Sequence, residues 1–340
     1  MPELPEAEVV RRGLDRWVSG RRVAAVEILD PRSLRRQEGG PAAFESALIG
    51  ARFSAAARRG KFLWLPFSRD GSEEPRDAVV AHLGMSGQVL LQDAGMAEPR
   101  HLKIRMTLDG GPAGAGADLP GELRFVDQRI FGGMFISPLV PTEDGAPGGA
   151  GTGLPLIPAA AGHIARDVLD PVWDPASFHR AVTRLPSGRP RTTGVKRVIL
   201  DQAVISGVGN IYADEALWYA RLHYERPASA LTRQQSGVLL ESLVDVMLRS
   251  LEEGGTSFDS LYVNVNGESG YLNIDVERVE GSRTVKRRDW RCRTAARRQR
   301  VVSRSDLARR ALAKPLSGPT CSAAHRHGAG LQSLGGANHA

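Results

Sequence analysis

Met1-Pro2-Glu3-Leu4-Pro5-Glu6 opens the chain and supplies the chemistry around which the fold is organised. Removal of Met1 would leave Pro2 with a free secondary amine. An α-amino group titrates near pH 8, about two pH units below a lysine side chain, so part of it is neutral at cellular pH. If a helix starts here, the positive end of its dipole lowers the pKa of the amine further. Such an amine can form a Schiff base with a sugar aldehyde carbon.

Two acids stand beside this amine. Glu3 and Glu6 lie three residues apart, so on a helix their carboxylates share one face close to Pro2. The pattern predicts a nucleophile flanked by two carboxylates. A structural alternative stays open at this point, because proline is common at the first helical positions and acids favour the first turn of any helix.

The residues that follow predict an α+β protein. Residues 3–18 have the spacing of an amphipathic helix, with Val10, Leu14 and Trp17 on one face. Gly, Pro and Asp turns then separate short β-type runs, which favours an antiparallel β-sandwich over βαβ units. The predicted strands are Arg22–Leu29, Ala51–Ala57, Phe62–Leu65, Ala78–His82, Gln88–Leu91, Leu102–Leu108, Leu123–Val126 and Met134–Ile136.

From Pro171 onward the pattern becomes helical. Asn210 is placed to cap one of these helices, after the turn Ser206-Gly207-Val208-Gly209. The stretches 110–121 and 141–162 are rich in Gly, Ala and Pro and are expected to be mobile loops, the second within an interdomain linker. The predicted helices are Pro175–Leu185, Gly194–Val204, Ile211–Ala220 and Thr232–Leu251, and the predicted linker spans 141–165.

The composition indicates where a nucleic-acid-binding surface can lie and in which cell compartment the protein works. The formal net charge is +7, but residues 283–314 hold 13 Lys and Arg against two Asp, whereas residues 1–282 hold 31 against 36 Asp and Glu. A nucleic-acid surface on the body must therefore be a local patch. No apolar run reaches about eighteen residues, so no membrane partner is expected. The acidic start is unlike a secretory signal, and two cysteines fit a reducing cytoplasm.

Further motifs extend the opening into a family pattern. The start continues as Ala7-Glu8-Val9-Val10-Arg11-Arg12-Gly13-Leu14. Later blocks follow in order: Arg59-Gly60-Lys61, His82-Leu83-Gly84-Met85-Ser86-Gly87, Asp127-Gln128-Arg129-Ile130-Phe131-Gly132, Gly207-Val208-Gly209-Asn210-Ile211-Tyr212-Ala213-Asp214-Glu215 and Tyr262-Val263-Asn264-Val265-Asn266-Gly267-Glu268-Ser269-Gly270-Tyr271. Together they resemble formamidopyrimidine-DNA glycosylase over roughly residues 1–275. The resemblance implies a catalytic β-sandwich domain at 1–140 and a helical DNA-binding domain at 166–275 with a helix–two-turn–helix element.

By this resemblance, Pro2 is the nucleophile that attacks C1′ of a nucleotide flipped out of the duplex. Glu3 is expected to donate a proton during opening of the sugar ring, and Glu6 to orient or support the site. Lys61 matches a family lysine that acts as a proton donor for β-elimination. The alternative for Lys61 is a surface lysine at the start of a strand.

The resemblance also implies side chains that enter the duplex. Met85 and Phe131 are expected to fill the gap left by the extruded base, and Arg129 to hydrogen-bond the orphaned partner base. Core packing is the alternative for Met85 and Phe131. The flanking Gly84 and Gly132 favour exposed loop tips instead.

Other DNA contacts are implied at a helix start and at three basic positions. Asn210 follows glycines, so backbone N–H groups there can bind a phosphate. Lys196, Arg191 and His101 match basic family positions. The segment Gly254–Tyr271 resembles the loop that covers the flipped base, with glycines as hinges.

The last segment departs from the family. Relatives end in a four-cysteine zinc finger that also supplies an arginine for δ-elimination, whereas this chain has only Cys292 and Cys321, so neither zinc nor another cofactor is expected. The alternative is a metal site formed by these cysteines with His325 and His327. Residues 276–340 are expected to form a disordered basic tail, either a zincless finger or the product of out-of-frame translation. Such a tail would add salt-sensitive affinity for DNA.

The sequence therefore predicts a monomeric glycosylase and AP lyase of the cytoplasm, associated with the nucleoid. Its expected partner is double-stranded DNA that contains oxidised purines, such as 8-oxoguanine and formamidopyrimidines, or abasic sites. Two alternatives stay open: an oxidised-pyrimidine glycosylase of the endonuclease VIII type, and a damage-binding protein with little turnover because the finger is lost. The opening Pro-Glu-Leu-Pro-Glu favours the purine branch.

Overall fold

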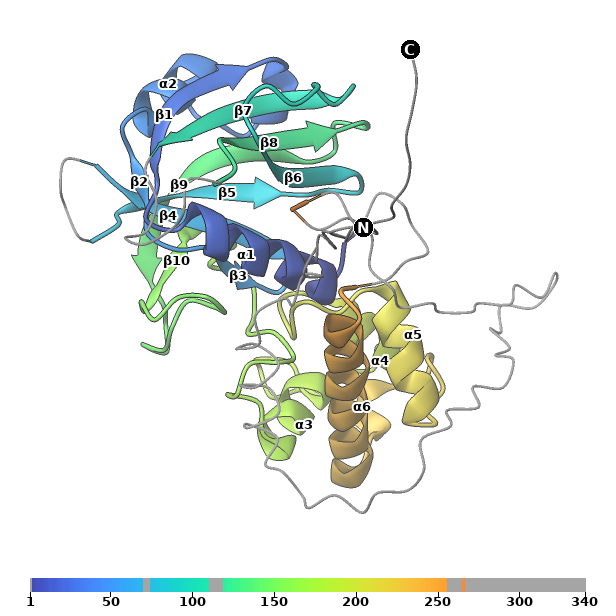
Figure 1. Ribbon diagram of the computed structural model, residues 1–340. Helices are drawn as coiled ribbons and strands as arrows, with labels where there is room; N and C mark the ends of the chain where they lie inside the picture. Colours follow the sequence, from blue (N-terminus) through green and yellow to red (C-terminus); the bar gives the residue numbers. More distant parts are fainter. Residues whose placement is uncertain (1, 70–73, 110–118, 256–264, 267–340) are drawn as a thin grey trace, which may run out of the picture.

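The helix α1 (Leu4–Val18) starts directly after Pro2 and Glu3 in the computed structural model and lies at the boundary between a β-rich half and a helical half (Figure 1). Glu3 is the N-cap residue, and the backbone N–H of Glu3 donates to the Glu6 carboxylate at 3.0 Å. This reciprocal capping explains why the helix begins where it does. The structure describes residues 2–69, 74–109, 119–255 and 265–266.

Ten strands of the described chain form one sheet, and every strand pair in it is antiparallel. The order across the sheet is β10-β9-β5-β4-β2-β1-β7-β8-β6, and β3 pairs with β4. The strands are β1 (Arg22–Ile28), β2 (Arg52–Phe53), β3 (Ala57–Arg59), β4 (Phe62–Ser68), β5 (Asp77–His82), β6 (Gly87–Gln92), β7 (Leu102–Asp109), β8 (Glu122–Asp127), β9 (Gly133–Pro141) and β10 (Leu156–Pro158).

The sheet folds over a shared core, which gives the two-layered form predicted as a sandwich. Leu65 and Val79 of β4 and β5 belong to the same buried cluster as Ile104 and Phe125 of β7 and β8. Leu14 of α1 joins this cluster and is fully buried. The apolar face of α1 therefore closes the sandwich core and leaves the start of the helix at the junction with the helical half (Figure 1).

Two helical segments between β1 and β2 were not predicted. They are the 3₁₀ helix η1 (Pro31–Leu34) and the helix α2 (Gly40–Leu48). Only Phe44 and Leu48 of α2 are buried. Two apolar contacts in nine residues are too few to produce a recognisable helical period.

The prediction that residues 141–162 form a mobile loop is wrong. Strand β10 of this segment pairs with β9, Ala150 bridges to Arg58 through two backbone hydrogen bonds of 2.8 and 2.9 Å, and Arg59 Nε donates to the Gly148 carbonyl at 2.7 Å. A Cβ on Gly149 would lie 2.2 Å from the Arg58 carbonyl oxygen. Glycine is thus required for close backbone packing here, which a composition-based argument mistakes for mobility.

The helical half contains α3 (Pro175–Thr183), α4 (Val195–Leu200), α5 (Asn210–Tyr219) and α6 (Arg233–Glu252). The short 3₁₀ helices η2 (Ala159–Ala161) and η3 (Ala228–Ala230) complete the element order. The predicted helix ending at Val204 is too long, because α4 stops at Leu200. Asp201 ends it: its side chain accepts from the Ala203 N–H at 3.0 Å, and its carbonyl accepts from the Val204 N–H at 2.9 Å.

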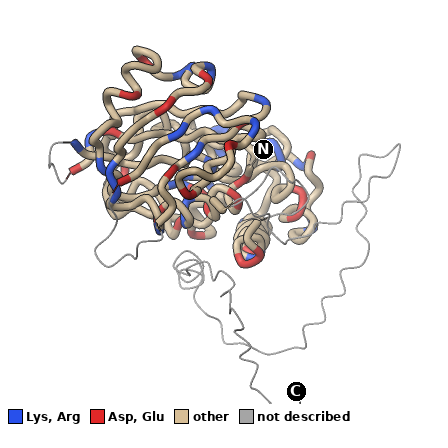
Figure 2. Tube along the Cα trace, turned by 45° about the horizontal axis from the view of Figure 1, so that its top comes forward, with Lys and Arg blue, Asp and Glu red and all other residues tan. Residues whose placement is uncertain are grey.

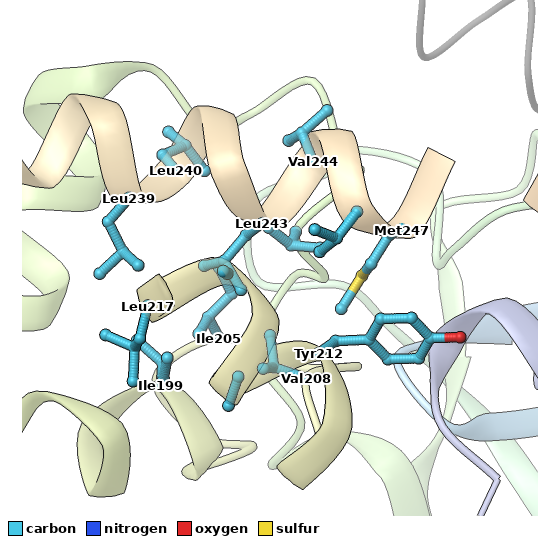
Figure 3. Close-up of a cluster of buried hydrophobic side chains, with 14 of the residues drawn as sticks. Ile199, Ile205, Val208, Tyr212, Leu217, Leu239, Leu240, Leu243, Val244 and Met247 are labelled. Atoms are coloured by element: carbon cyan, nitrogen blue, oxygen red, sulfur yellow. The ribbon is translucent and has the colours of Figure 1, made fainter. Parts of the chain in front are cut away.

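One buried cluster joins these helices. Figure 3 shows Leu243 and Met247 of α6 facing the cluster from one side, with Leu217 of α5 and Ile199 of α4 on the other. Tyr212 of α5 packs its ring into the same cluster, and its hydroxyl points away from the cluster. This core therefore fixes where the Tyr212 hydroxyl lies.

A buried ion-pair network ties the two halves together at the base of α1. Arg58 on β3 is fully buried, and its guanidinium donates to Glu8 at 2.9 Å and to Asp167 at 2.8 Å. Burial works to raise the pKa of Glu8, but the charges of Arg58 and Arg11 outweigh it and hold that pKa at about 2. Asp167 also accepts the Gly60 N–H at 3.2 Å, so one network positions residues next to Lys61.

Replacement of Arg58 by Met is expected to lower the free energy of unfolding by about 3–5 kcal/mol, because it leaves Glu8 and Asp167 buried without their shared partner. Urea denaturation measures the loss. The matched control is Arg22→Met, which removes an exposed arginine from β1. A loss for Arg58→Met no larger than for this control would show that the network contributes nothing to stability.

Within the described residues, no helix combines the length and apolar composition that a membrane span requires.

Candidate active site

The start of the chain is docked onto the loop that precedes α5. Pro2 and Glu3 are buried, and the Leu4 N–H donates to the Gly207 carbonyl at 3.1 Å. The Glu3 carboxylate accepts the Gly209 N–H at 2.7 Å and the Ile211 N–H at 3.0 Å. It therefore caps the N-terminal end of α5, where free N–H groups and the helix dipole favour an anion.

Glycine is required at this contact. A Cβ on Gly209 would lie 2.2 Å from the Glu3 carboxyl carbon, and a Cβ on Gly207, which has φ +91°, would lie 2.5 Å from the Leu4 side chain. The Gly-Val-Gly turn thus lets the first residues of the chain approach the helical half closely.

The prediction that Asn210 caps α5 is wrong. Gly209 is the N-cap residue, Asn210 is the first residue of the helix, and its side chain is exposed. The capping carboxylate comes from Glu3, more than 200 positions earlier in the chain. Sequence patterns detect local caps, whereas this cap is supplied by tertiary contact.

Glu3 has the protonation behaviour of an acid that works at neutral pH. Burial raises its pKa to about 7, against the opposing effects of Lys61 and the two backbone N–H donors, and with a smaller contribution from Glu6 in the same direction as burial. Near pH 7 a substantial fraction of this carboxyl group carries a proton. A group with a pKa close to the operating pH is suited to general acid catalysis.

Lys61 lies at the same junction. Its Nζ donates to the Val208 carbonyl at 2.9 Å, and burial lowers its pKa while Glu3 and Glu6 act to raise it. The alternative of an ordinary surface lysine does not hold, because the side chain is half-buried and directed at the loop before α5. A lowered pKa makes the ammonium group a stronger proton donor than an exposed lysine.

Sequence reasoning missed Tyr212 and Ser250. The Tyr212 hydroxyl donates to Glu6 at 2.8 Å and contacts Ser250 Oγ of α6 at 2.5 Å, while the other oxygen of Glu6 accepts the Glu3 N–H at 3.0 Å. This chain of hydrogen bonds links α6, through α5, to the residue next to Pro2. A tyrosine within an apolar core requires a polar partner for its hydroxyl, which is the one signal that points to it.

Two exposed apolar side chains lie at adjacent loop tips. Met85 is 42% exposed and Phe131 is 52% exposed, so core packing is not their role. A Cβ on Gly84 would lie 2.5 Å from the Gly132 backbone nitrogen, which shows that the two loops touch. Arg129, on the same loop as Phe131, is also exposed.

The sequence comparisons match this arrangement. The formamidopyrimidine-DNA glycosylase N-terminal domain matches residues 1–134, and the formamidopyrimidine-DNA glycosylase H2TH domain matches residues 168–261. The chain belongs to the formamidopyrimidine-DNA glycosylase family. Relatives carrying that name include one from Leifsonia xyli subsp. xyli, 52% identical over 80% of this chain and 87% of the relative, and one from Streptomyces avermitilis, 50% identical over 90% and 95%.

Solved structures share the fold of this family member. A complex of Lactococcus lactis Fpg with DNA containing an abasic site has a TM-score of 0.59 at 23% identity, covering 79% of this chain and 84% of that chain. A complex of a mutant Lactococcus lactis enzyme with DNA containing Fapy-dG has a TM-score of 0.61 over 79% and 85%.

The basic positions implied by the family differ in their surroundings. Lys196 Nζ forms an ion pair with Asp214 of α5 at 2.8 Å. Arg191 Nε donates to the carbonyls of Ala181 and Arg184, so this side chain supports the turn between α3 and α4. The carbonyl of His101 accepts the N–H of Asp127, the residue from which the Phe131 loop starts, at 3.0 Å. Of the three, only His101 is tied directly to that loop.

Several predictions fall on residues that the structure does not describe. Of the segment expected to cover the flipped base, Gly254, Gly255 and residues 265–266 are described, and Val265 packs into the sandwich core. The tail at 276–340, with Cys292, Cys321, His325 and His327, lies outside the described residues. Two cysteines in the full sequence do not fit a four-cysteine zinc finger.

Basic and acidic residues are mixed along the part of the chain that the structure describes. Figure 2 shows Lys and Arg interspersed with Asp and Glu along the described chain. A positive patch for DNA must therefore be local.

Proposed function

We propose that this family member removes oxidised purines, such as 8-oxoguanine and formamidopyrimidines, from double-stranded DNA and then cleaves the abasic strand. The observation that carries the proposal is the buried Glu3 carboxyl group, which has a pKa of about 7 and sits beside Pro2 at the junction of the two halves. We propose that it works in the cytoplasm, associated with the nucleoid, because that is where its proposed substrate lies.

In the proposed reaction, the neutral amine of Pro2 attacks C1′ of the flipped nucleotide after Met1 has been removed. The bond from C1′ to the base breaks, and the base leaves as an anion that takes up the proton lost by the amine. Glu3 donates its proton to the ring oxygen as the sugar opens, which leaves a Glu3 carboxylate and a cationic Schiff base between Pro2 and C1′. Loss of a proton from C2′ and departure of the 3′-phosphate then complete β-elimination.

Neighbouring residues serve these steps in different ways. Lys61, with its lowered pKa, exchanges a proton during elimination. Glu6 holds the Glu3 backbone N–H and is itself fixed by the Tyr212 hydroxyl. Because Tyr212 is anchored in the helical core, the site is complete only when both halves of the protein are docked.

The exposed loop tips fit contact with the duplex. We assign Met85 and Phe131 to the gap left by the extruded base, and Arg129 to the unpaired partner base. We assign the exposed Asn210 side chain to a phosphate contact, because Glu3 already binds the Gly209 and Ile211 N–H groups at the start of α5. We also assign Lys196, Arg191 and His101 to contacts with the DNA backbone.

Borohydride trapping tests the proposal directly. The full-length protein, incubated with a duplex that contains one abasic site, is expected to give a covalent protein–DNA adduct, and a duplex with 8-oxoguanine is expected to be cleaved at the lesion. A version that ends near Asn273 tests whether the tail contributes.

Other outcomes separate the alternatives. Retained duplex binding without an adduct would mean a damage-binding protein rather than an enzyme. Cleavage of oxidised pyrimidines but not of 8-oxoguanine would assign the chain to the endonuclease VIII branch.

A further inference from the structure

The loop between β8 and β9, residues 127–133, carries Arg129 and Phe131 and is called the wedge loop below. Its backbone is unfavourable at Ile130, which has φ +55°. A β-branched residue rarely adopts this conformation without support from its surroundings. The shape of the wedge loop must therefore be held by contacts outside its own residues.

One support lies inside the loop. The fully buried Asp127 carboxylate accepts the Arg129 N–H at 3.1 Å and the Gly132 N–H at 2.7 Å. It also accepts the hydroxyl of Ser86, the residue after Met85, at 2.5 Å. The Asp127 carboxylate thus accepts hydrogen bonds from both loops, the one that carries Met85 and the one that carries Phe131.

A second support comes from Arg35, which the catalytic site does not use. Arg35 Nη1 donates to the carbonyls of Ile130 at 2.8 Å and Gly132 at 3.0 Å, and Nη2 donates to the carbonyl of Phe131 at 2.6 Å. One guanidinium therefore binds three successive carbonyl groups at the tip of the wedge loop. The planar fork of arginine suits this task, whereas a lysine ammonium offers a single point of contact.

The backbone at Arg35 is itself held in place. Arg35 directly follows η1, whose N-cap Asp30 accepts the Arg32 N–H at 3.1 Å. A Cβ on Gly133 would lie 2.4 Å from the Ser33 carbonyl oxygen, so η1 packs directly against the start of β9. Arg35 thus connects the wedge loop to η1, which packs against β9 of the sandwich.

We propose that Arg35 is a positioning residue. It holds the wedge loop, before DNA binds, in the conformation that presents Phe131 and Arg129 to the duplex. This inference rests on the proposed function, because it assumes that Phe131 and Arg129 enter the gap in the duplex. Pre-ordering the loop removes the cost of ordering it on binding, and so favours DNA that offers a gap over intact DNA. Arg35 acts through the loop, since its donors already bind the loop carbonyls.

The test measures the binding preference for a duplex with one tetrahydrofuran abasic analogue over the same undamaged duplex. Arg35→Gln is expected to lower this preference about tenfold, an effect within the range seen for contacting residues, and Arg35→Lys to recover it only in part. The matched control is Arg36→Gln, which removes the same charge from the neighbouring exposed position and should weaken binding to both duplexes equally.

A double-mutant cycle with Phe131→Ala distinguishes positioning from general destabilisation. In the Phe131→Ala background, Arg35→Gln is expected to change the preference less than it does in the wild-type background, because Arg129 is then the one assigned duplex contact that the loop still carries. Independent, multiplying effects of the two substitutions, or equal behaviour of Arg35→Gln and Arg36→Gln, would overturn the proposal. The readout is binding, so a protein that fails the trapping test but retains its preference refutes the enzymatic proposal alone.

Discussion

A protein whose N-terminus is blocked is expected to form no borohydride-trapped adduct, a loss of at least about 10³-fold, because the attacking nitrogen is then part of an amide bond. A fusion with a cleavable N-terminal extension makes the comparison clean, since proteolysis that leaves Pro2 as the first residue should restore trapping in the same preparation. The measurement is the yield of covalent adduct on a duplex with one abasic site.

Binding supplies the control for this experiment. Before and after proteolysis, affinity for the tetrahydrofuran duplex reports whether the fusion still docks on DNA. Trapping by the uncleaved fusion, with docking intact, would remove Pro2 from the mechanism and place the nucleophile elsewhere.

Glu3→Gln is expected to slow base excision by about 10²–10⁴-fold while the abasic analogue is still bound, because the variant lacks the transferable proton. In the wild-type enzyme, the acid form is lost as the pH rises through about 7, so the single-turnover rate should fall above neutrality. The variant should lack this alkaline limb. Glu225→Gln, which removes an exposed carboxylate remote from Pro2 in the sequence, is the matched control. An unchanged alkaline limb in Glu3→Gln would assign the titrating group to another residue.

The same pKa predicts how stability depends on pH. The pKa of Glu3 is raised on folding from 4.5 to about 7. The contribution of Glu3 to the free energy of unfolding is therefore fully present below pH 4.5 and is lost as the pH rises through 7. Relative to Glu3→Gln, the wild-type protein should lose up to about 3 kcal/mol between pH 5 and pH 8. Urea denaturation at the two pH values measures this difference.

Local patterns in the sequence were sufficient for the main elements. Alternating apolar residues separated by turn residues predicted the antiparallel strands, and the helical period predicted α1 and α6, because both signals depend only on neighbours in the chain. Gly84 and Gly132 likewise indicated exposed loop tips at Met85 and Phe131, which the structure confirms.

Only the tertiary structure decided the chemistry of the junction. The proton affinity of Glu3 depends on its burial against Gly209 and Ile211, more than 200 positions away, and no local pattern encodes such a contact. The same holds for Tyr212, whose hydroxyl reaches Glu6 only because its ring is anchored between α5 and α6. The sequence by itself determined which ionisable groups are present, and it predicted Pro2 as the nucleophile and Glu3 and Lys61 as proton donors. Folding determined their pKa values and partners, because burial and long-range contact exist only once the two halves have docked.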